Sequence, residues 1–354
     1  MIFFIIPYNK IGGAEKVHLE IIRSVYQHKR IIICFYDTDG SPISEDFSNI
    51  ATIFILNSNL KKKLFTSVLI SISYIFPITV FGCNSDHFYT LLPKIAKSSA
   101  TVDLTHAFAF PDIGKEDIAL NYIPLINKRI VINKRTLTDY ENEYKAAGID
   151  KNYLRRFQII PNGIPINEFD PSLIDERFSK FKIGFVGRYS PEKRPELFLT
   201  LASSEIENGL MAKMIVDDFK LSKSDYVNIE LVEGLTDAIS VRKEFSDISV
   251  LIVPSLREGF PLVIMEAMEL GIPVISTAVG SIEEHLENGK NGFISKSIDS
   301  DDFLKFCSEK IHLLAENKEL YSKLSFSARI YAEEKFNIND FHKAYRSILL
   351  DVTK

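Results

Sequence analysis

The sequence PSLREGFPLVIMEAM occupies residues 254–268 and follows an apolar run, VLIV, at residues 250–253. This pattern predicts a buried strand, a polar turn and a helix that begins near Pro261. Such a turn points backbone N–H groups and the positive end of a helix dipole at one place, which suits a phosphate. Glu258 in the turn and Glu266 in the helix would accept hydrogen bonds from hydroxyl-rich groups on either side. A phosphate between two polyols describes a nucleotide sugar.

Length and composition set the broad class of the chain. Its 354 residues are enough for two domains, and a net charge of −5 gives no electrostatic reason to expect a nucleic-acid partner. The cysteines Cys34, Cys83 and Cys307 are scattered, with no CxxC pair. This spacing favours a reducing compartment and argues against disulfides and against a zinc site.

Two apolar segments raise the question of a membrane. Residues 1–6 are too short for a signal peptide and predict a buried strand. Residues 64–81 are interrupted by serine, threonine and proline, whereas a span needs roughly 20 mostly apolar residues. We therefore expect a buried helix followed by a strand. Because Lys61, Lys62 and Lys63 precede this run, a helix lying on an anionic membrane surface is the alternative.

Apolar runs alternate with helical patterns along the whole chain. In the first half we expect strands at 1–6, 30–35, 52–56, 78–82, 101–106 and 129–132, the last being the final strand of that half, and helices at 14–27, 87–97 and 121–127. The same pattern restarts at 181–187 and runs to 281–286, and three helices follow at 301–316, 318–336 and 338–352. Such alternation predicts an α/β fold with two doubly wound parallel sheets. Ligands bind outside the carboxyl ends of such strands, so both sheets should feed a cleft.

Several residues at predicted strand ends can carry chemistry, and each also has a plainer interpretation. Gly12 and Gly13 would let the backbone approach a phosphate, or form an ordinary turn. Gly187 and Arg188, followed by Lys193, could grip a diphosphate or be a solvated loop. His106 ends a strand and could be catalytic or structural.

The two glutamates of residues 254–268 also have alternative roles. Glu258 and Glu266 could be a general acid and base or could bind ligand hydroxyls. The chain has no acidic pair in an obvious metal loop, no Ser/His/Asp pattern and no GxxxxGK[ST] motif. We therefore predict no metal and no cofactor other than the nucleotide-sugar substrate.

Six segments together resemble the retaining glycosyltransferases of family 4, which have the GT-B fold. Residues 255–275 carry the E-x7-E signature of that family and the A-x-x-x-G-x-P-V strand after it. The other matching segments are the glycine loop at 12–15, the linker at 160–164, the loop at 185–195, and the segments 280–284 and 289–293. The likeness is strong over about 155–354 and looser over 1–154, as expected where a variable acceptor is bound.

The resemblance implies roles for these residues. Arg188 and Lys193 would neutralise the leaving diphosphate, and Gly187 would end the strand before them. Glu258 would hold the donor sugar and Glu266 the ribose. The remaining implied donor-site residues are the backbone of Gly259, Phe260, Pro261 and Leu262, the base contact near Val232, the phosphate loop at Gly12 and Gly13, and the sugar-facing His106. Proline has no N–H, so Pro261 itself cannot donate.

The resemblance also implies domains and a reaction. An N-terminal acceptor domain would span 1–160 and be completed by the final helix at about 336–354, and a donor domain would span 161–335. The reaction would move a sugar from a UDP or GDP sugar to a hydroxyl of a saccharide, lipid-linked or soluble, with retention and without metal. The expected setting is synthesis of O antigen, capsule or another surface polysaccharide, in the cytoplasm or at the inner face of its membrane.

Three alternatives remain open at this stage. A transferase with a soluble acceptor, or a phosphorylase of the same fold, would need no membrane surface. A non-catalytic nucleotide-sugar-binding protein would be expected to have lost Arg188, Lys193 or a signature glutamate, and all are present. One departure affects the base site: the family has Gly-x-Gly after the strand ending at Val216, and this chain has Asp217-Asp218-Phe219.

Overall fold

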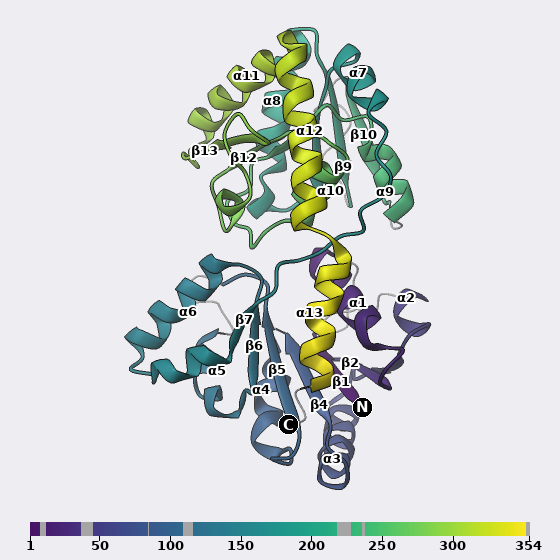
Figure 1. The fold of residues 1–354 in the computed structure, drawn as a ribbon, viewed down its shortest axis with the longest axis vertical. Coiled ribbons are helices and arrows are strands. Elements are labelled where there is room, and N and C mark those ends of the chain that lie inside the picture. The colour runs from purple at the N-terminus through teal and green to yellow at the C-terminus, as the bar shows by residue number, and fades with distance from the viewer. Residues whose placement is uncertain are drawn as a thin grey trace. The chain divides into compact units, whose positions relative to one another are not determined.

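The structure, a computed structural model, describes residues 1–7, 12–36, 45–83, 85–108, 116–217, 228–235 and 238–351. The chain divides into two compact units. Unit 1 consists of Met1–Gly163 with Ile338–Lys354, and unit 2 is Ile164–Asn337. The sequence placed these boundaries at residue 160 and about residue 336. Each unit is a parallel β-sheet with helices packed on it, which confirms the predicted fold class (Figure 1).

The sheet of unit 1 has seven strands within the described residues, in the order β3-β2-β1-β4-β5-β6-β7. In chain order they are β1 (Ile2–Ile6), β2 (Ile31–Phe35), β3 (Thr52–Ile55), β4 (Thr79–Cys83), β5 (Ala100–Thr105), β6 (Lys128–Val131) and β7 (Phe157–Ile159). Neighbouring strands pair in parallel. The inner strands β1, β2, β4 and β5 are buried along their whole length, because both faces of a parallel sheet are covered.

The helices of unit 1 include one from the far end of the chain. They are α1 (Gly13–Val25), α2 (Glu45–Ser48), α3 (Asn59–Ile75), α4 (Asp86–Leu91), α5 (Glu116–Leu120), α6 (Lys134–Ala146) and α13 (Ile338–Asp351), with short 3-10 turns η1 (Leu92–Lys94), η2 (Ile123–Leu125) and η3 (Lys151–Arg156). Helix α13 packs on α1. Its Phe341, Tyr345 and Leu349 are buried, and His342 Nε2 lies 2.8 Å from Glu20 Oε2. The final helix therefore lies on the unit where the resemblance placed it.

Helix α3 corrects the expectation of a buried helix. The helix and the following strand β4 are present, but only Leu69 and Ser73 of α3 are buried. Leu60 is 77% exposed, Leu64 is 64% exposed and Ile75 is 68% exposed. The apolar residues of α3 lie on more than one side of the helix, so one covered face cannot hold them all and several remain on the surface.

The sheet of unit 2 has six strands within the described residues, in the order β10-β9-β8-β11-β12-β13. They are β8 (Lys182–Gly187), β9 (Met211–Val216), β10 (Ile229–Glu233), β11 (Val250–Val253), β12 (Val274–Thr277) and β13 (Gly292–Ser295). The helices are α7 (Ser172–Ser179), α8 (Pro195–Glu207), α9 (Ala238–Phe245), α10 (Leu262–Glu269), α11 (Ser300–Glu316) and α12 (Lys318–Lys335), with 3-10 turns η4 (Pro191–Lys193) and η6 (Ile282–Glu284).

Some elements differ from the sequence-based prediction. Strand β6 is not the last of unit 1, because β7 pairs with it at the edge of the sheet. Strand β13 was likewise not anticipated. The α-helix expected at 121–127 does not form. Helix α5 ends before it, at Leu120, and the 3-10 turn η2 takes its place. Pro124 lies in that turn, and proline removes the N–H that a longer helix would need.

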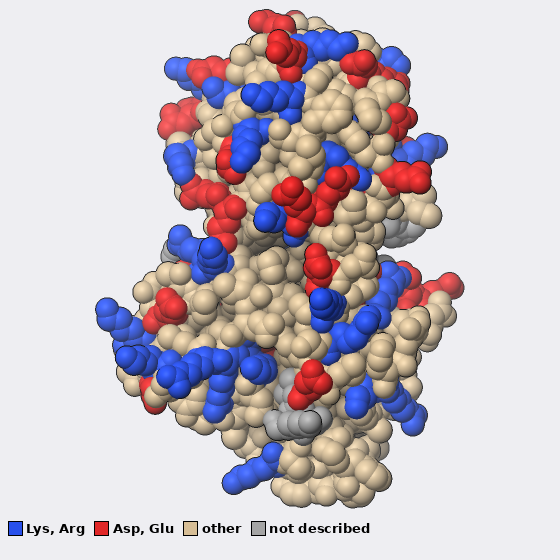
Figure 2. Space-filling view, viewed as in Figure 1, with Lys and Arg blue, Asp and Glu red and all other residues tan. Residues whose placement is uncertain are grey.

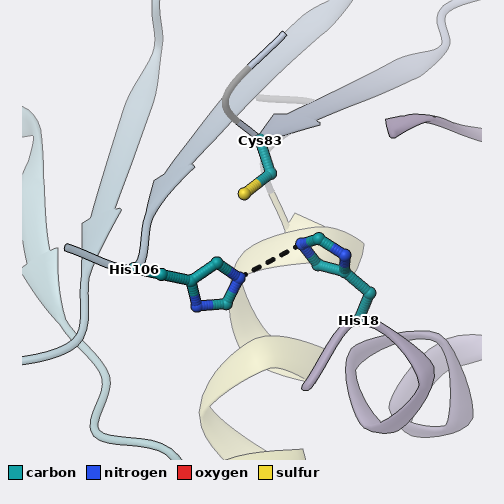
Figure 3. Close-up of side chains that lie close together, drawn as sticks. All are labelled: His18, Cys83 and His106. Carbon is teal, nitrogen blue, oxygen red and sulfur yellow. Dashed lines mark hydrogen bonds between the residues drawn. The ribbon is translucent and has the colours of Figure 1, made fainter. Parts of the chain in front are cut away.

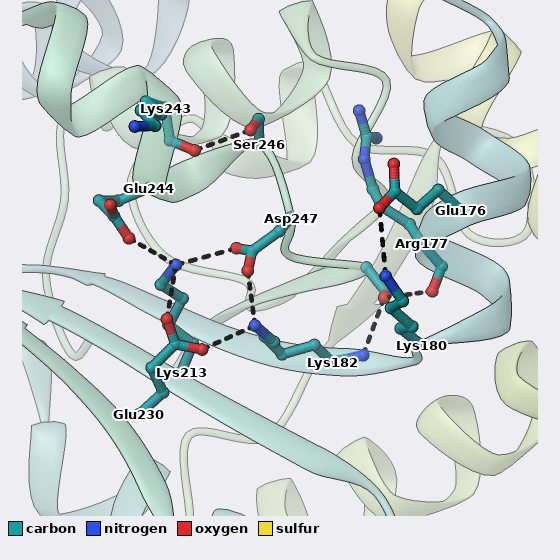
Figure 4. A network of polar contacts seen from close by, with 11 residues as sticks. Glu176, Arg177, Lys180, Lys182, Lys213, Glu230, Lys243, Glu244, Ser246 and Asp247 are labelled. Carbon is teal, nitrogen blue, oxygen red and sulfur yellow. Dashed lines mark hydrogen bonds and ion pairs between the residues drawn. The ribbon is translucent and has the colours of Figure 1, made fainter.

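Buried charges in unit 2 are compensated by a network that ties its strands together (Figure 4). Lys182 Nζ lies 2.7 Å from Glu230 and 2.5 Å from Asp247. Lys213 is 2% exposed, and its Nζ contacts Glu230, Asp247 and Glu244 at 2.7–3.0 Å. The network links β8, β9, β10 and α9, and it explains a lysine in the middle of a buried strand, because a buried ammonium must be paired.

The order in which the strands are added to each sheet reverses once. In unit 1 the change falls between β1 and β4, and in unit 2 it falls between β8 and β11. At such a point the loops that leave the two neighbouring strands run to opposite sides, which opens a crevice at the carboxyl edge. The loops after β8 and β11 contain the residues that the sequence singled out in unit 2.

Candidate functional site

The candidate site of unit 2 lies where β8 and β11 end. After β11 the chain turns through residues 254–261, and α10 begins at Leu262 with Pro261 as its N-cap. Pro261 has an extended backbone, and its side chain makes no capping hydrogen bond at the N-terminus of α10. Strand β8 pairs with β11, and η4 follows it. The fold thus places the Glu258 turn and the Lys193 loop side by side.

Lys193 and Glu258 form an ion pair in this site. Lys193 Nζ lies 2.5 Å from Glu258 Oε1, and Ser255 Oγ donates to the same oxygen at 2.7 Å. The Glu258 side chain is 8% exposed and the Lys193 side chain 20% exposed. Two residues predicted to bind neighbouring parts of one ligand are therefore in contact, although 65 positions separate them. Ser255 was not singled out from the sequence, and its hydrogen bond fixes the Glu258 carboxylate.

The loop after β8 is held to the turn by backbone contacts. Leu256 N–H donates to Glu192 O at 2.8 Å, and Arg194 Nε donates to Pro254 O at 2.5 Å. Arg194 takes a left-handed conformation with φ of 51°, which lets the loop end and α8 begin. Arg188 is 64% exposed and pairs with Glu192 Oε1 at 3.3 Å. Lys193 is therefore fixed, while Arg188 can extend into solvent toward a ligand.

Residues at the end of β12 and after it hold the turn at residues 254–261 in place. Ser281 donates to Gly259 O through both its N–H and its Oγ, each at 2.9 Å. Thr277 Oγ1 donates to Ser255 O at 2.6 Å. Gly280 has φ of +60°, and a Cβ there would lie 2.1 Å from Glu258 O. Glycine at position 280 is thus required twice, once by its backbone conformation and once by the closeness of the turn.

An aromatic cluster holds Phe260. Its ring centroid lies 4.2 Å from that of His285 and 5.5 Å from that of Phe336. Burial lowers the pKa of His285 to about 4, so the imidazole is neutral at pH 7 and packs as an uncharged ring. His285 Nδ1 lies 3.0 Å from Tyr331 Oη. Phe260 is buried, and its contribution to a ligand site would be its backbone, as predicted.

The other predicted residues of unit 2 lie on β8, β10 and α10. Gly187 is the last residue of β8, Val232 lies near the end of β10, and Glu266 lies on α10. Glu266 is partly exposed. Asp217, next to the missing Gly-x-Gly, accepts a hydrogen bond from Tyr189 N–H at 3.2 Å. Residues 218–219 of that departure lie outside the described residues.

Unit 1 places its predicted residues at the carboxyl edge of its own sheet. Gly12 is the N-cap of α1, and its N–H donates to Glu15 Oε2 at 3.0 Å. Gly13 is the first residue of α1 and is exposed. His106 follows β5 directly, and its Nε2 lies 3.2 Å from His18 Nε2 on α1 (Figure 3). Residues 8–11, the first part of the predicted glycine loop, lie outside the described residues.

Cys83 completes a group with the two histidines. It ends β4, and the ligand atoms of Cys83, His18 and His106 all lie within 4.8 Å of one another. Burial lowers the pKa of His106 to about 4. Burial also lowers the pKa of His18 well below its ordinary value, and the neighbouring imidazole adds to the effect on His18. Burial also raises the pKa of the Cys83 thiol. This group was missed from the sequence, because its members come from α1, β4 and the end of β5 and share no local motif.

Comparison with known proteins agrees with this geometry. Residues 180–312 match the family described as glycosyl transferases group 1. The chain is 29% identical over 194 residues to the capsular polysaccharide biosynthesis glycosyltransferase CapM of Staphylococcus aureus, covering 50% of this chain and 49% of that protein. It is 28% identical over 236 residues to UDP-Gal:alpha-D-GlcNAc-diphosphoundecaprenol alpha-1,3-galactosyltransferase of Escherichia coli, covering 60% of each. The chain thus spans about half to three-fifths of the length of these two relatives.

Solved structures extend the likeness to the whole chain. The HepE protein of Anabaena in complex with UDP superposes with a TM-score of 0.76 at 18% identity, covering 99% of each chain. The fold is GT-B. The matched family and the fold are both those of glycosyltransferases, and relatives act in capsular polysaccharide biosynthesis.

The contact between Gly280 and the turn gives a stability prediction. In Gly280→Ala the new methyl group clashes with Glu258 O, whereas Gly289, with φ of +72°, has no atom near its added Cβ. Both alanines adopt the left-handed conformation, which costs roughly 1–2 kcal/mol. Urea unfolding should show Gly280→Ala to be less stable than Gly289→Ala by a further ~1–3 kcal/mol from overpacking. Equal free energies of unfolding for the two variants would contradict this prediction, because the turn would then move away from the new methyl group without cost.

Proposed function

We propose that this chain transfers a sugar from a nucleoside-diphosphate sugar to a hydroxyl of a lipid-linked saccharide, with retention of anomeric configuration and without a metal ion. The product would enter a cell-surface polysaccharide. The observation that carries the proposal is the Lys193–Glu258 pair at the β8/β11 crossover, next to the N-terminus of α10. This arrangement offers a cation, a carboxylate and a helix N-terminus at one place.

The charge flow of the reaction suits these groups. As the nucleoside diphosphate leaves, negative charge grows on its β-phosphate and the anomeric carbon becomes cationic. Lys193, Arg188 and the α10 N-terminus would stabilise the leaving phosphate, which removes the need for a metal ion. No carboxylate is assigned as a nucleophile. The acceptor would therefore attack from the face that the phosphate leaves, and the phosphate would take its proton.

The two glutamates would read the two ends of the donor. Glu258 already accepts from Lys193 and Ser255 through Oε1, which leaves Oε2 for hydroxyls of the sugar. Glu266, about one turn along α10, would hold the ribose, and Val232 would lie against the base. In unit 1, the backbone of Gly12 and Gly13 and the side chain of His106 are the residues proposed to bind the donor. HepE binds UDP, which favours a UDP sugar over a GDP sugar.

A lipid-linked acceptor is supported by a relative and by α3. The name of the Escherichia coli relative includes a diphosphoundecaprenol acceptor. No helix within the described residues is long and apolar enough to cross a membrane. Leu60, Leu64 and Ile75 are exposed on one face of α3. In Figure 2 the α3 surface is mostly tan, with lysine and arginine side chains around it.

The three lysines near the start of α3 divide into two groups. Lys61 and Lys63 are exposed, whereas Lys62 turns toward the Tyr36 ring, with its Nζ 6.0 Å from the ring centroid. An exposed apolar face flanked by cations is the pattern of a helix that lies in the interface of an anionic membrane. We therefore propose that α3 is the membrane contact, with its apolar face inserted and with Lys61 and Lys63 near the headgroups.

The donor site is tested by substitution of its ion pair. We expect Lys193→Ala to lower kcat by about 100-fold or more, because it removes a charge that stabilises the leaving phosphate. Glu258→Ala should lose transfer with every donor of a UDP- and GDP-sugar panel. The control is Lys290→Ala, which breaks an exposed pair with Glu287 and should leave kcat unchanged. Wild-type kcat in a folded Lys193→Ala protein would contradict the proposed role.

Retention is tested separately. Proton NMR of the early product, taken with an α-linked donor, should show an α-linked glycoside, because attack on the leaving face preserves configuration. A β-linked product would refute the mechanism while leaving the donor-site assignment intact.

Membrane contact is tested by flotation with anionic vesicles. The wild-type chain should float at low salt. A triple variant, Leu60→Ser, Leu64→Ser and Ile75→Ser, should remain at the bottom, because it removes apolar area that would insert in the bilayer. The matched control is Ile330→Ser, whose side chain is 53% exposed on α12. Flotation of the triple variant like wild type would rule out α3 as the contact.

A further inference from the structure

Three metal-ligating side chains meet at the carboxyl edge of the unit 1 sheet. His18 comes from the buried face of α1, Cys83 is the last residue of β4, and His106 follows the last residue of β5 (Figure 3). Strands β1 and β4 flank the crossover of this sheet, and α1 follows β1. Among the described residues, this is the one group of three or more histidine, cysteine or acidic side chains whose ligand atoms converge in this way.

The distances suit a tetrahedral ion. Two imidazole nitrogens bound to one zinc at about 2.0–2.1 Å and at the tetrahedral angle lie about 3.3 Å apart. His18 Nε2 and His106 Nε2 lie 3.2 Å apart. Cys83 Sγ is within 4.8 Å of both, so an ion would need to draw the sulfur inward.

We propose that His18 Nε2, His106 Nε2 and Cys83 Sγ bind a divalent ion of the zinc class, with a fourth position left to water. On binding, the thiol of Cys83 loses its proton to solvent and the sulfur forms a bond to the ion. In the hydrogen bond between the rings one imidazole carries its proton on Nε2. On binding, that proton leaves Nε2 for solvent and a proton is taken up at Nδ1 of the same ring, so that both rings offer the ion an Nε2 lone pair. The hydrogen bond between the two rings is lost in exchange.

The choice of ion follows from the donor atoms. Imidazole nitrogen and thiolate sulfur favour zinc and its neighbours, whereas Mg²⁺ and Ca²⁺ require oxygen ligands. Three protein ligands from three separate elements leave an open position, as in zinc sites that exchange their fourth ligand. His18 and Cys83 are 2% and 3% exposed, so the ion would be shielded from solvent on that side.

Binding here would oppose the reaction proposed above. The ion would hold His106 Nε2 and turn the ring away from a donor sugar, so zinc would inhibit transfer; this part rests on the proposed function. The site itself does not rest on it, because binding can be measured without a nucleotide sugar. Zinc would then be a regulator and not a cofactor.

The test uses the full chain after dialysis against a chelator. Zinc added at increasing concentrations should bind at one ion per chain, measured by equilibrium dialysis with elemental analysis. Cobalt in place of zinc should give the intense near-ultraviolet absorption of a thiolate–cobalt bond. Cys83→Ser should lose that absorption, and His18→Gln should weaken zinc binding at least about tenfold. Cys34→Ser, which removes another buried thiol of the same sheet, is the matched control and should bind like wild type.

A second measurement needs no variant. Zinc should slow the alkylation of Cys83 in the wild-type chain and leave alkylation of Cys307 unchanged, as followed by peptide mass spectrometry. The proposal fails if no ion binds stoichiometrically, if Cys83→Ser and Cys34→Ser bind alike, or if zinc leaves Cys83 alkylation unchanged. If zinc does not bind to the wild-type chain while that chain still transfers sugar, the zinc site is refuted and the proposed function is not.

Discussion

The crossover between β8 and β11 is the constraint on which the candidate site of unit 2 depends. Parallel strands bring all their carboxyl ends to one edge, and the change of direction lets two loops leave that edge on opposite sides. The space between the loops is where Lys193 and Glu258 meet. Neither residue could reach the other if β8 and β11 were separated by another strand. The chemistry of the site therefore follows from strand order first and from residue identity second.

The Lys193–Glu258 pair has a cost as well as a role. Both side chains are largely buried, so the pair must offset the loss of hydration of two charges, and Ser255 contributes a further hydrogen bond to the carboxylate. A pair like this is weak evidence for stability. It is better explained as a preorganised arrangement, since a lysine held in place loses little freedom when a phosphate arrives. The backbone of the turn is likewise held in place before a ligand arrives, by its contacts with Gly280, Ser281 and Thr277.

Local patterns in the sequence predicted more than distant contacts did. The strand, turn and helix at 250–269 were predicted because burial, the polar turn and the helix period are all local, and the final three helices were predicted for the same reason. Strands β7 and β13 were missed because each is short and lies at a sheet edge, where one side of the strand lacks a pairing partner. The exposed face of α3 could not be predicted, since hydrophobicity alone does not say whether a helix is covered.

Contacts between residues that are far apart in the sequence were the hardest to predict. The family resemblance assigned Lys193 and Glu258 to neighbouring parts of one ligand, but the ion pair between them was not predicted. The group of His18, Cys83 and His106 has no such pattern, and the scattered cysteines pointed away from a zinc site. In the fold, adjacency of β4 and β5 and the position of α1 after β1 bring the three together.

The two sheets apply one topological rule to different chemistry. In unit 2 the crossover gathers an ammonium, a carboxylate and a helix N-terminus, which suits an anionic ligand whose charge increases during reaction. In unit 1 it gathers two imidazoles whose pKa values burial lowers and a thiol whose pKa burial raises, so these groups are uncharged at pH 7. Uncharged imidazoles can exchange hydrogen bonds with hydroxyl groups. The same absence of charge leaves nitrogen lone pairs available, which is why the edge of unit 1 is also the place where a zinc-class ion would find its ligands.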